Sequence, residues 1–168
     1  MLPSEKQLLV NDLNNQFHHH GATHVIDAVL KHGVLGQVAM VSSFGAESAA
    51  LLHLIAITRP DTPVLFIDTY MLFVETLIYQ SDLAEQLGLK TLRILRADPA
   101  TIAKHDPNNT LNKDAPDTCC HLRKTSVLKN ALVPYDGWIT GRKRYHGNKR
   151  AELEFFEYDA PDDKFKIN

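Results

Sequence analysis

The chain has 168 residues, of which 44% are hydrophobic and 23% are charged, a balance that is ordinary for one soluble globular domain. Its formal net charge of −2 gives no positive field that would attract nucleic acid or an anionic membrane. No run of about 18 apolar residues occurs and the N-terminus has no apolar signal core, so the sequence predicts a cytoplasmic protein without a membrane span.

Apolar residues at helical spacing predict a first helix over residues 4–17, with Ser4 as its N-cap, and a second over 23–32, ending at Gly33. Later helices are expected at 47–58, 73–87 and 120–132, and short apolar runs predict strands at 38–41, 64–67, 91–95 and 137–140. Residues 98–118 contain three prolines and read as the longest irregular region, of a length that is often functional.

Strands and helices therefore alternate along most of the chain. This order implies parallel strands joined by right-handed crossovers. The predicted fold class is α/β, with a single open, mainly parallel sheet flanked by helices, and the whole of 1–168 forms one domain.

Ligands of open parallel sheets bind beyond the carboxyl ends of the strands, and polar segments follow the predicted strands there. In the segment 42–48, small residues at a helix N-terminus suit an anion, although an ordinary turn capped by serine fits as well. Asp68 could orient a ligand or cap the next helix. The basic loop 140–150, which includes Arg142 and Arg144, suits phosphate or sulfate groups; a solvated surface loop is the alternative.

The adjacent cysteines Cys119 and Cys120 are the only cysteines in the chain, and Arg123 and Lys124 follow closely. Nearby cations favour the thiolate, which is the reactive and metal-binding form of cysteine. Zinc sites usually space their cysteines more widely, an iron–sulfur cluster usually needs four thiolates, and a redox dithiol usually has two intervening residues. Two buried, unreactive thiols are the remaining alternative, which the neighbouring cations disfavour.

Taken together, these segments resemble the assimilatory adenylyl-sulfate and phosphoadenylyl-sulfate reductases. The resemblance rests on Ser43-Phe44-Gly45-Ala46-Glu47-Ser48, Asp68-Thr69 with Leu72-Phe73 and Glu75-Thr76, Cys119-Cys120-His121-Leu122-Arg123-Lys124, and Trp138-Ile139-Thr140-Gly141-Arg142-Lys143-Arg144. These blocks occur in the order of the family and cover roughly residues 35–168.

The resemblance implies an adenine-nucleotide α-hydrolase-like fold and reduction of adenylyl sulfate to sulfite and AMP, a step of sulfate assimilation and cysteine biosynthesis. Thioredoxin or glutaredoxin would supply the electrons. Substrate contacts are expected from Ser43, Phe44, Gly45, Ala46, Glu47, Ser48, Asp68, Lys124, Arg142 and Arg144. Tandem cysteines in this family carry a 4Fe–4S cluster, so Cys119 and Cys120 are expected to be two of its four ligands.

The chain departs from the pattern of the family in two ways. Tyr70 stands where the family usually has glycine after Asp-Thr, and glycine alone adopts positive φ without strain. The other cluster ligands and the nucleophilic cysteine of the family would follow Asn168, so a C-terminally truncated domain is expected, with no catalytic nucleophile of its own.

Other functions stay open at this point. The chain could be a non-catalytic adenine-nucleotide-binding fragment or paralogue, or it could act on 3′-phosphoadenylyl sulfate. An ATP pyrophosphatase shares the fold, but its loop is richer in glycine than the one around Phe44 and Glu47. The sequence leaves the number of copies in solution open, a homo-oligomer included.

Overall fold

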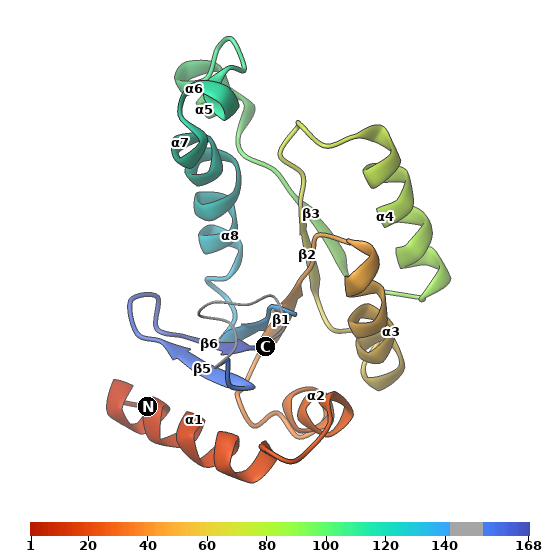
Figure 1. Ribbon diagram of the computed structural model, residues 1–168, viewed down its shortest axis with the longest axis vertical. Helices are drawn as coiled ribbons and strands as arrows, with labels where there is room; N and C mark the ends of the chain where they lie inside the picture. The colour runs from red at the N-terminus through yellow and green to blue at the C-terminus, as the bar shows by residue number, and fades with distance from the viewer. Residues whose placement is uncertain (142–152) are drawn as a thin grey trace.

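Six strands form one sheet in the computed structural model, which describes residues 1–141 and 153–168 (Figure 1). The strands are β1 (Val38–Val41), β2 (Val64–Ile67), β3 (Leu92–Leu95), β4 (Gly137–Ile139), β5 (Phe156–Asp159) and β6 (Lys164–Ile167). Their order across the sheet is β3-β2-β1-β4-β6-β5. Four of the five pairings are parallel, and β5 alone runs antiparallel to its neighbour β6. This confirms the predicted mainly parallel sheet.

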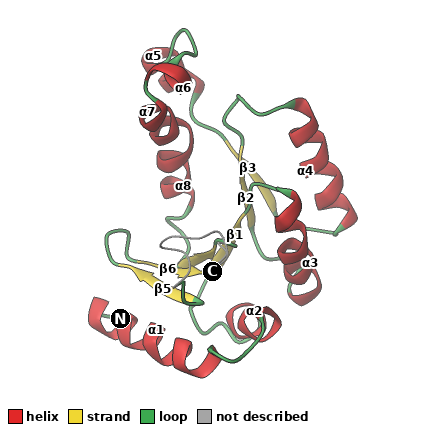
Figure 2. Ribbon diagram, viewed as in Figure 1, coloured by secondary structure: helices red, strands yellow, loops and turns green. Residues whose placement is uncertain are grey.

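Helices lie on both sides of the strands (Figure 2). They are α1 (Pro3–Phe17), α2 (Ala22–Leu30), α3 (Ala49–Thr58), α4 (Val74–Gln86), α5 (Pro99–His105), α6 (Leu111–Asp114), α7 (Pro116–Cys120) and α8 (Ser126–Ala131), with the short helical turns η1 (Ala46–Ser48) and η2 (His121–Thr125). Among the described residues, none of these helices is long and apolar enough to cross a lipid bilayer.

Alternate residues of the strands face two separate apolar clusters. Val38 and Met40 of β1 belong to the larger cluster, which also contains the apolar sides of α1 to α4. Ala39 and Val41 belong to the smaller one, where Leu128 of α8 and Leu132 pack. Since side chains alternate between the faces of a strand, β1 is covered on both sides, as buried parallel strands are.

The first helix begins earlier than the sequence predicts. Pro3 occupies its first position, where the missing N–H of proline costs nothing, and Leu2 is the N-cap. The side chain of Glu5 accepts a hydrogen bond of 2.6 Å from the backbone N–H of Leu2. Ser4 therefore lies inside the first turn, and the prediction that it caps the helix is wrong.

The prediction of an irregular region over 98–118 is also wrong, because three short helices occupy most of it. Two of its prolines, Pro99 and Pro116, stand at helix starts, where proline is favoured. Asp98 caps α5 by accepting a hydrogen bond of 2.9 Å from the N–H of Thr101. The prolines in this region therefore begin helices rather than prevent them.

The hairpin of β5 and β6, which the sequence analysis did not predict, completes the sheet. Asn14 of α1 holds β5 through two hydrogen bonds to the backbone of Phe156, of 2.9 and 3.0 Å. Gly137 of β4 lies against β6 so closely that a Cβ atom there would come within 2.6 Å of the Phe165 carbonyl oxygen. The hairpin thus depends on a polar anchor from α1 and on the absence of a side chain in β4.

Candidate functional site

The cysteine pair ends α7, which continues through η2 into α8 as one helical stretch. Both thiols are free; Cys119 is buried and Cys120 is exposed. Because residues four apart share a helix face, buried Cys119 is followed by buried Arg123, and exposed Cys120 by exposed Lys124. The motif is thereby divided into an inward-facing pair and an outward-facing pair.

The η2 turn between these residues is a π-helical turn. Such wide turns occur mostly as single insertions in α-helices, often at functional sites. The hydroxyl of Ser126 lies within hydrogen-bond distance of the carbonyl oxygens of His121 (2.9 Å) and Leu122 (3.1 Å). In a π-helical turn the carbonyls do not make the usual hydrogen bond to the N–H four residues later. The Ser126 hydroxyl offers them a donor and so stabilises the wide turn.

Arg123 is buried to 1% exposure and joins three segments of the chain. Its Nη1 donates to the Thr69 carbonyl (3.0 Å), and its Nη2 donates to Asp106 Oδ2 and to Asn109 Oδ1 (2.8 Å each). The guanidinium of Arg123, followed by the N–H groups of Leu111 and Thr110, lowers the pKa of Asp106, while burial acts in the opposite direction. The charge of Arg123 is therefore balanced inside the protein.

A pocket of about 340 Å³ lies between the cysteine helix and the loop that joins β2 to α4. Its lining includes Thr69, Met71 and Leu72 from the loop, and Cys119, Cys120 and Lys124 from the helix. Within residues 1–141 and 153–168, Lys124 makes no hydrogen bond or ion pair. The pocket thus combines two thiols with one uncommitted cation, a composition that suits an anionic ligand.

The loop after β2 contains the predicted site residue Asp68. Its Oδ1 accepts from the N–H of Tyr70 and its Oδ2 accepts from Nε of Arg96, each at 2.9 Å. Tyr70 has a φ of 61°, and the guanidinium carbon of Arg96 lies 5.7 Å from the centre of its ring. Both carboxylate oxygens of Asp68 are thus used to shape the loop, in which tyrosine occupies a conformation that favours glycine.

The predicted anion loop follows β1, the neighbour of β2 in the sheet. Ser43, Gly45, Ala46 and Glu47 are exposed, and Ser48 is half-buried. Phe44 instead turns inward at φ 56° and packs edge-on against Phe66, with ring centres 5.5 Å apart. None of these loop residues lines the cysteine pocket. Any contact of Phe44 with a substrate would have to come from its backbone.

Two predicted site residues, Arg142 and Arg144, lie outside the described residues. The strand before them, β4, pairs with β1 and ends at Ile139. The carboxyl ends of β1, β2 and β4 therefore meet at one edge of the sheet, as the sequence predicts for these segments.

The sequence analysis missed three polar residues that build the site: Arg96, Asp106 and Asn109. All three act by contacting other protein groups, and Asp106 and Asn109 lie in the region that was expected to be irregular. The tract Asp106-Pro107-Asn108-Asn109 is rich in turn formers, but this signal does not reveal a buried partner.

A metal centre needs more donors than the thiol pair alone supplies. Within the described part of the chain, no group of three or more His, Cys, Asp or Glu residues is placed to hold a metal ion. Adjacent thiols at the end of α7, one of them exposed, provide two donors of the kind that iron–sulfur clusters take, which is half of the usual set of four. The donors present fit part of such a site.

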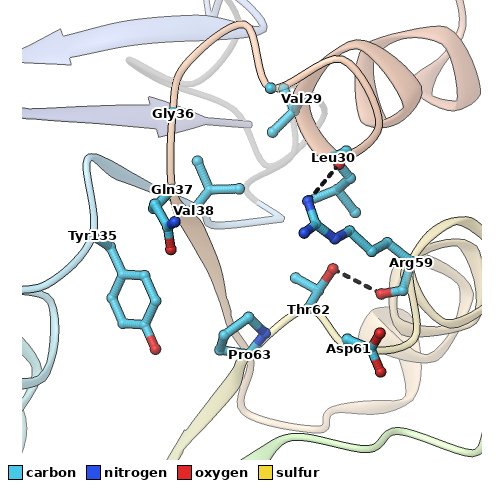
Figure 3. Close-up of a pocket in the computed structure, with 11 residues that line it drawn as sticks. Val29, Leu30, Gly36, Gln37, Val38, Arg59, Asp61, Thr62, Pro63 and Tyr135 are labelled. Atoms are coloured by element: carbon cyan, nitrogen blue, oxygen red, sulfur yellow. Dashed lines mark hydrogen bonds between the residues drawn. The ribbon is translucent and has the colours of Figure 1, made fainter.

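A second pocket, of about 370 Å³, lies near the amino ends of β1 and β2 (Figure 3). Arg59 Nη1 donates to the Leu30 carbonyl (2.9 Å), and Thr62 Oγ1 donates to the Arg59 carbonyl (2.8 Å). These contacts tie the turn before β2 to the end of α2. The pocket contains neither cysteine and lies at the sheet edge opposite to the one where ligands of such sheets bind.

The chain is similar to known proteins over most of its length. A model of the phosphoadenosine phosphosulfate reductase domain matches residues 37–168. The chain belongs to this family. It is 37% identical over 167 residues to an adenosine 5′-phosphosulfate reductase of Chelativorans sp. (strain BNC1), covering 99% of this chain and 67% of the relative. It is 41% identical over 121 residues to a protein of the same name from Mesorhizobium japonicum, covering 72% of this chain and 48% of that one.

This member of the phosphoadenosine phosphosulfate reductase family thus spans between about half and two thirds of the length of these two relatives. Its fold matches the crystal structure of a phosphoadenylyl-sulfate reductase from Candida auris, solved as a phosphate complex. The TM-score is 0.73 at 22% identity, over 95% of this chain and 76% of that chain. The likeness confirms the predicted adenine-nucleotide α-hydrolase-like fold.

Proposed function

We propose that the protein acts in the reduction of adenylyl sulfate to sulfite and AMP, as part of sulfate assimilation in the cytoplasm. The observation that carries the proposal is the pocket in which Cys119 and Cys120 lie beside the uncommitted cation of Lys124. Relatives named adenosine 5′-phosphosulfate reductase favour this substrate over its 3′-phosphorylated form.

The predicted binding residues have different roles toward the substrate. The exposed part of the loop Ser43–Ser48 offers backbone N–H groups at the start of a helical segment, which suit an anion. Lys124, together with Arg142 and Arg144, offsets the negative charge of the sulfate and phosphate groups. Asp68 acts on the substrate indirectly, since both of its oxygens hold the loop after β2.

Cys119 and Cys120 are the residues that would hold a 4Fe–4S cluster. A cluster of this type takes thiolate ligands, usually four, and the 168 residues contain two cysteines. When bound, the cluster supplies iron sites for the two thiolates next to Lys124. The chain's own contribution is to hold both thiols on adjacent positions of one helix, with Cys120 facing the pocket from its exposed side.

Thioredoxin or glutaredoxin would supply the electrons. Reduction of the sulfur in adenylyl sulfate to sulfite needs two electrons, and a dithiol that becomes a disulfide provides both. The cysteine thiolate that attacks the sulfur and displaces AMP would have to come from outside Cys119 and Cys120 if both of these hold the cluster.

Calorimetry with the reduced chain tests the binding part of the proposal. Adenylyl sulfate should bind, and Lys124→Gln should weaken its affinity by about tenfold or more, because a charge-assisted bond is lost. Lys129→Gln is the matched control, since Lys129 lies on the same helical stretch but pairs with Asp162. No binding of adenylyl sulfate, or equal weakening by both variants, would contradict the proposal.

A second candidate function is a nucleotide-binding module without catalysis, which the presence of only two cysteines favours. Sulfite release from adenylyl sulfate in the presence of thioredoxin separates the two candidates. Saturable binding without sulfite supports the module, whereas steady release by this chain supports the reductase.

A further inference from the structure

Arg123 is the largest of the fully buried side chains in the described part of the protein, and it lies in the wide turn directly after the cysteine pair. Its guanidinium bonds to two segments that are far apart in the sequence: the loop after β2 through Thr69, and the turn after α5 through Asp106 and Asn109. One side chain thus fastens the cysteine helix to two neighbouring loops.

Arg123 is among the residues that line the cysteine pocket, but its guanidinium is bound to protein groups. The side chains of Arg123 and Asp106 are 2% and 1% exposed, and Nη2 lies 2.8 Å from Oδ2. The other oxygen of Asp106 accepts from the N–H groups of Thr110 and Leu111, at 2.9 and 3.1 Å. Asp106 therefore connects the arginine to the start of α6. Of the two cations that follow the cysteines, only Lys124 is left to offset an anion.

The same contacts fix the width of the cysteine pocket. One wall is the loop that contains Thr69, whose carbonyl accepts from Arg123. The other wall is the helix that contains Cys119, one turn before Arg123 and on the same face. Residues from both the loop and the helix line the pocket. A displaced Arg123 would let the thiol-bearing turn move relative to the loop.

We propose that Arg123 is a positioning residue, which holds the Cys119–Cys120 pair at a fixed place against the Thr69 loop without contacting the ligand itself. This deepens the proposed function, and it rests on that function only in taking the cysteine pair to be the reactive site. Its partners Asp106 and Asn109 take part in this positioning, because both accept from Nη2 of the guanidinium.

Thiol labelling tests the proposal without any nucleotide. In a Cys120→Ser background, only Cys119 reacts with a thiol reagent, and its burial makes labelling depend on local opening. Arg123→Lys keeps a positive charge near Asp106 but cannot make all three hydrogen bonds. We expect Cys119 to react about tenfold faster in this variant, as local opening becomes easier. In a Cys119→Ser background, Cys120 is already exposed and should react at nearly its original rate.

Two controls separate positioning from a general loss of stability. Ile55→Val weakens the core on the opposite face of the sheet and should leave the labelling rate of Cys119 within about twofold of the original, since the opening is local. Arg59→Lys alters an arginine that donates to the Leu30 carbonyl near the amino ends of the strands and should also leave the rate unchanged. The proposal is wrong if Arg123→Lys lowers the melting temperature without changing the labelling rate of Cys119. It is also wrong if Ile55→Val raises that labelling rate as much as Arg123→Lys does.

Asn109→Gly provides a second variant if Arg123→Lys does not fold, because glycine tolerates the φ of 53° that Asn109 adopts. Asn109 is an exposed residue that supplies one of the three acceptors, so its removal should leave the fold intact and still accelerate the labelling of Cys119, by about threefold. An unchanged rate in this variant would overturn the proposal. Because the assay contains no nucleotide, its failure is distinct from a failure of adenylyl sulfate to bind.

Discussion

Two arginine–aspartate pairs hold the loop after β2, one through Asp68 and one through the Thr69 carbonyl, and they differ in their access to water. Arg96 and Asp68 meet at 2.9 Å with side-chain exposures of 46% and 6%, whereas Arg123 and Asp106 meet at 2.8 Å with exposures of 2% and 1%. The distances are nearly equal, so the difference between the pairs is burial.

Burial decides what each pair can do. A solvated pair contributes little to stability because water screens it, but it can still shape a loop, as Asp68 does for Tyr70. A buried ion pair costs desolvation free energy to form, and the loss of one partner leaves an uncompensated charge inside the protein. The Arg123 pair should therefore be much more sensitive to substitution than the Arg96 pair.

The largest expected effect follows from Arg123→Met. The substitution removes three hydrogen bonds and leaves Asp106 buried without a cation, which should lower the free energy of unfolding by about 3–5 kcal/mol. Urea denaturation followed by circular dichroism measures this loss. A decrease below about 1 kcal/mol, the range of exposed pairs, would show that the two pairs are alike.

The contribution of the buried pair to stability should also depend on pH. The pKa of Asp106 is held below its ordinary value of 3.8, chiefly by Arg123, so the carboxylate stabilises the fold above that value. The stabilisation is lost as pH falls through the lower pKa of the folded state. In Asp106→Asn, this part of the acid dependence is absent. The difference in melting temperature between the original protein and the variant should therefore shrink from about pH 6 to about pH 2. A constant difference over that interval would contradict the assignment.

Tyr70 tests what the exposed pair does for the loop. Its φ of 61° strains any residue with a Cβ atom, by about 1–2 kcal/mol. Tyr70→Ala keeps the strain and loses the ring contact with Arg96, while Tyr70→Gly loses the contact but also the strain. Thermal unfolding should therefore show the glycine variant to be more stable than the alanine variant by about 1 kcal/mol. Equal stabilities would mean that the loop changes conformation in both.

The smallest effect is expected for Arg96→Met, the counterpart of Arg123→Met. Nearly half of the Arg96 side chain is exposed, so the free energy of unfolding should fall by no more than about 1 kcal/mol. Asp68 keeps its hydrogen bond from the N–H of Tyr70. The same urea titration measures both methionine variants, and a loss equal to that of Arg123→Met would remove burial as the explanation.

The sheet was largely predictable because its strands have a strong local signal. The apolar runs of β1 and β2 lie at the predicted residues, and strands buried on both faces are apolar throughout. The hairpin of β5 and β6 was missed because its residues alternate with charges, as in Lys164-Phe165-Lys166-Ile167. What places it in the sheet is distant in the sequence: the parallel pairing with β4 and the side chain of Asn14.

Some residues that line the candidate pocket could be named from the sequence, but the contacts that build the pocket could not. The cysteine pair and the cation of Lys124 were found because adjacent reactive groups are visible in the sequence. Neither the burial of Arg123 nor the partnership with Asp106 could be found in this way, since both depend on how α5 and α6 return to the cysteine helix. Charged residues are almost never fully buried unless they are paired, and pairing is a property of the fold.

The wide turn between α7 and α8 has a further consequence for the geometry of the helix. Each residue of an α-helix advances the direction of the side chains by about 100°, so the extra residue in a π-helical turn offsets everything before it from everything after it. The cysteines of α7 and the sheet-facing side chains of α8, such as Leu128, thus follow two different phases of one helix. Removing a single residue from His121–Thr125 would bring the phases together and rotate both thiols by about that angle, away from the loop that they now face.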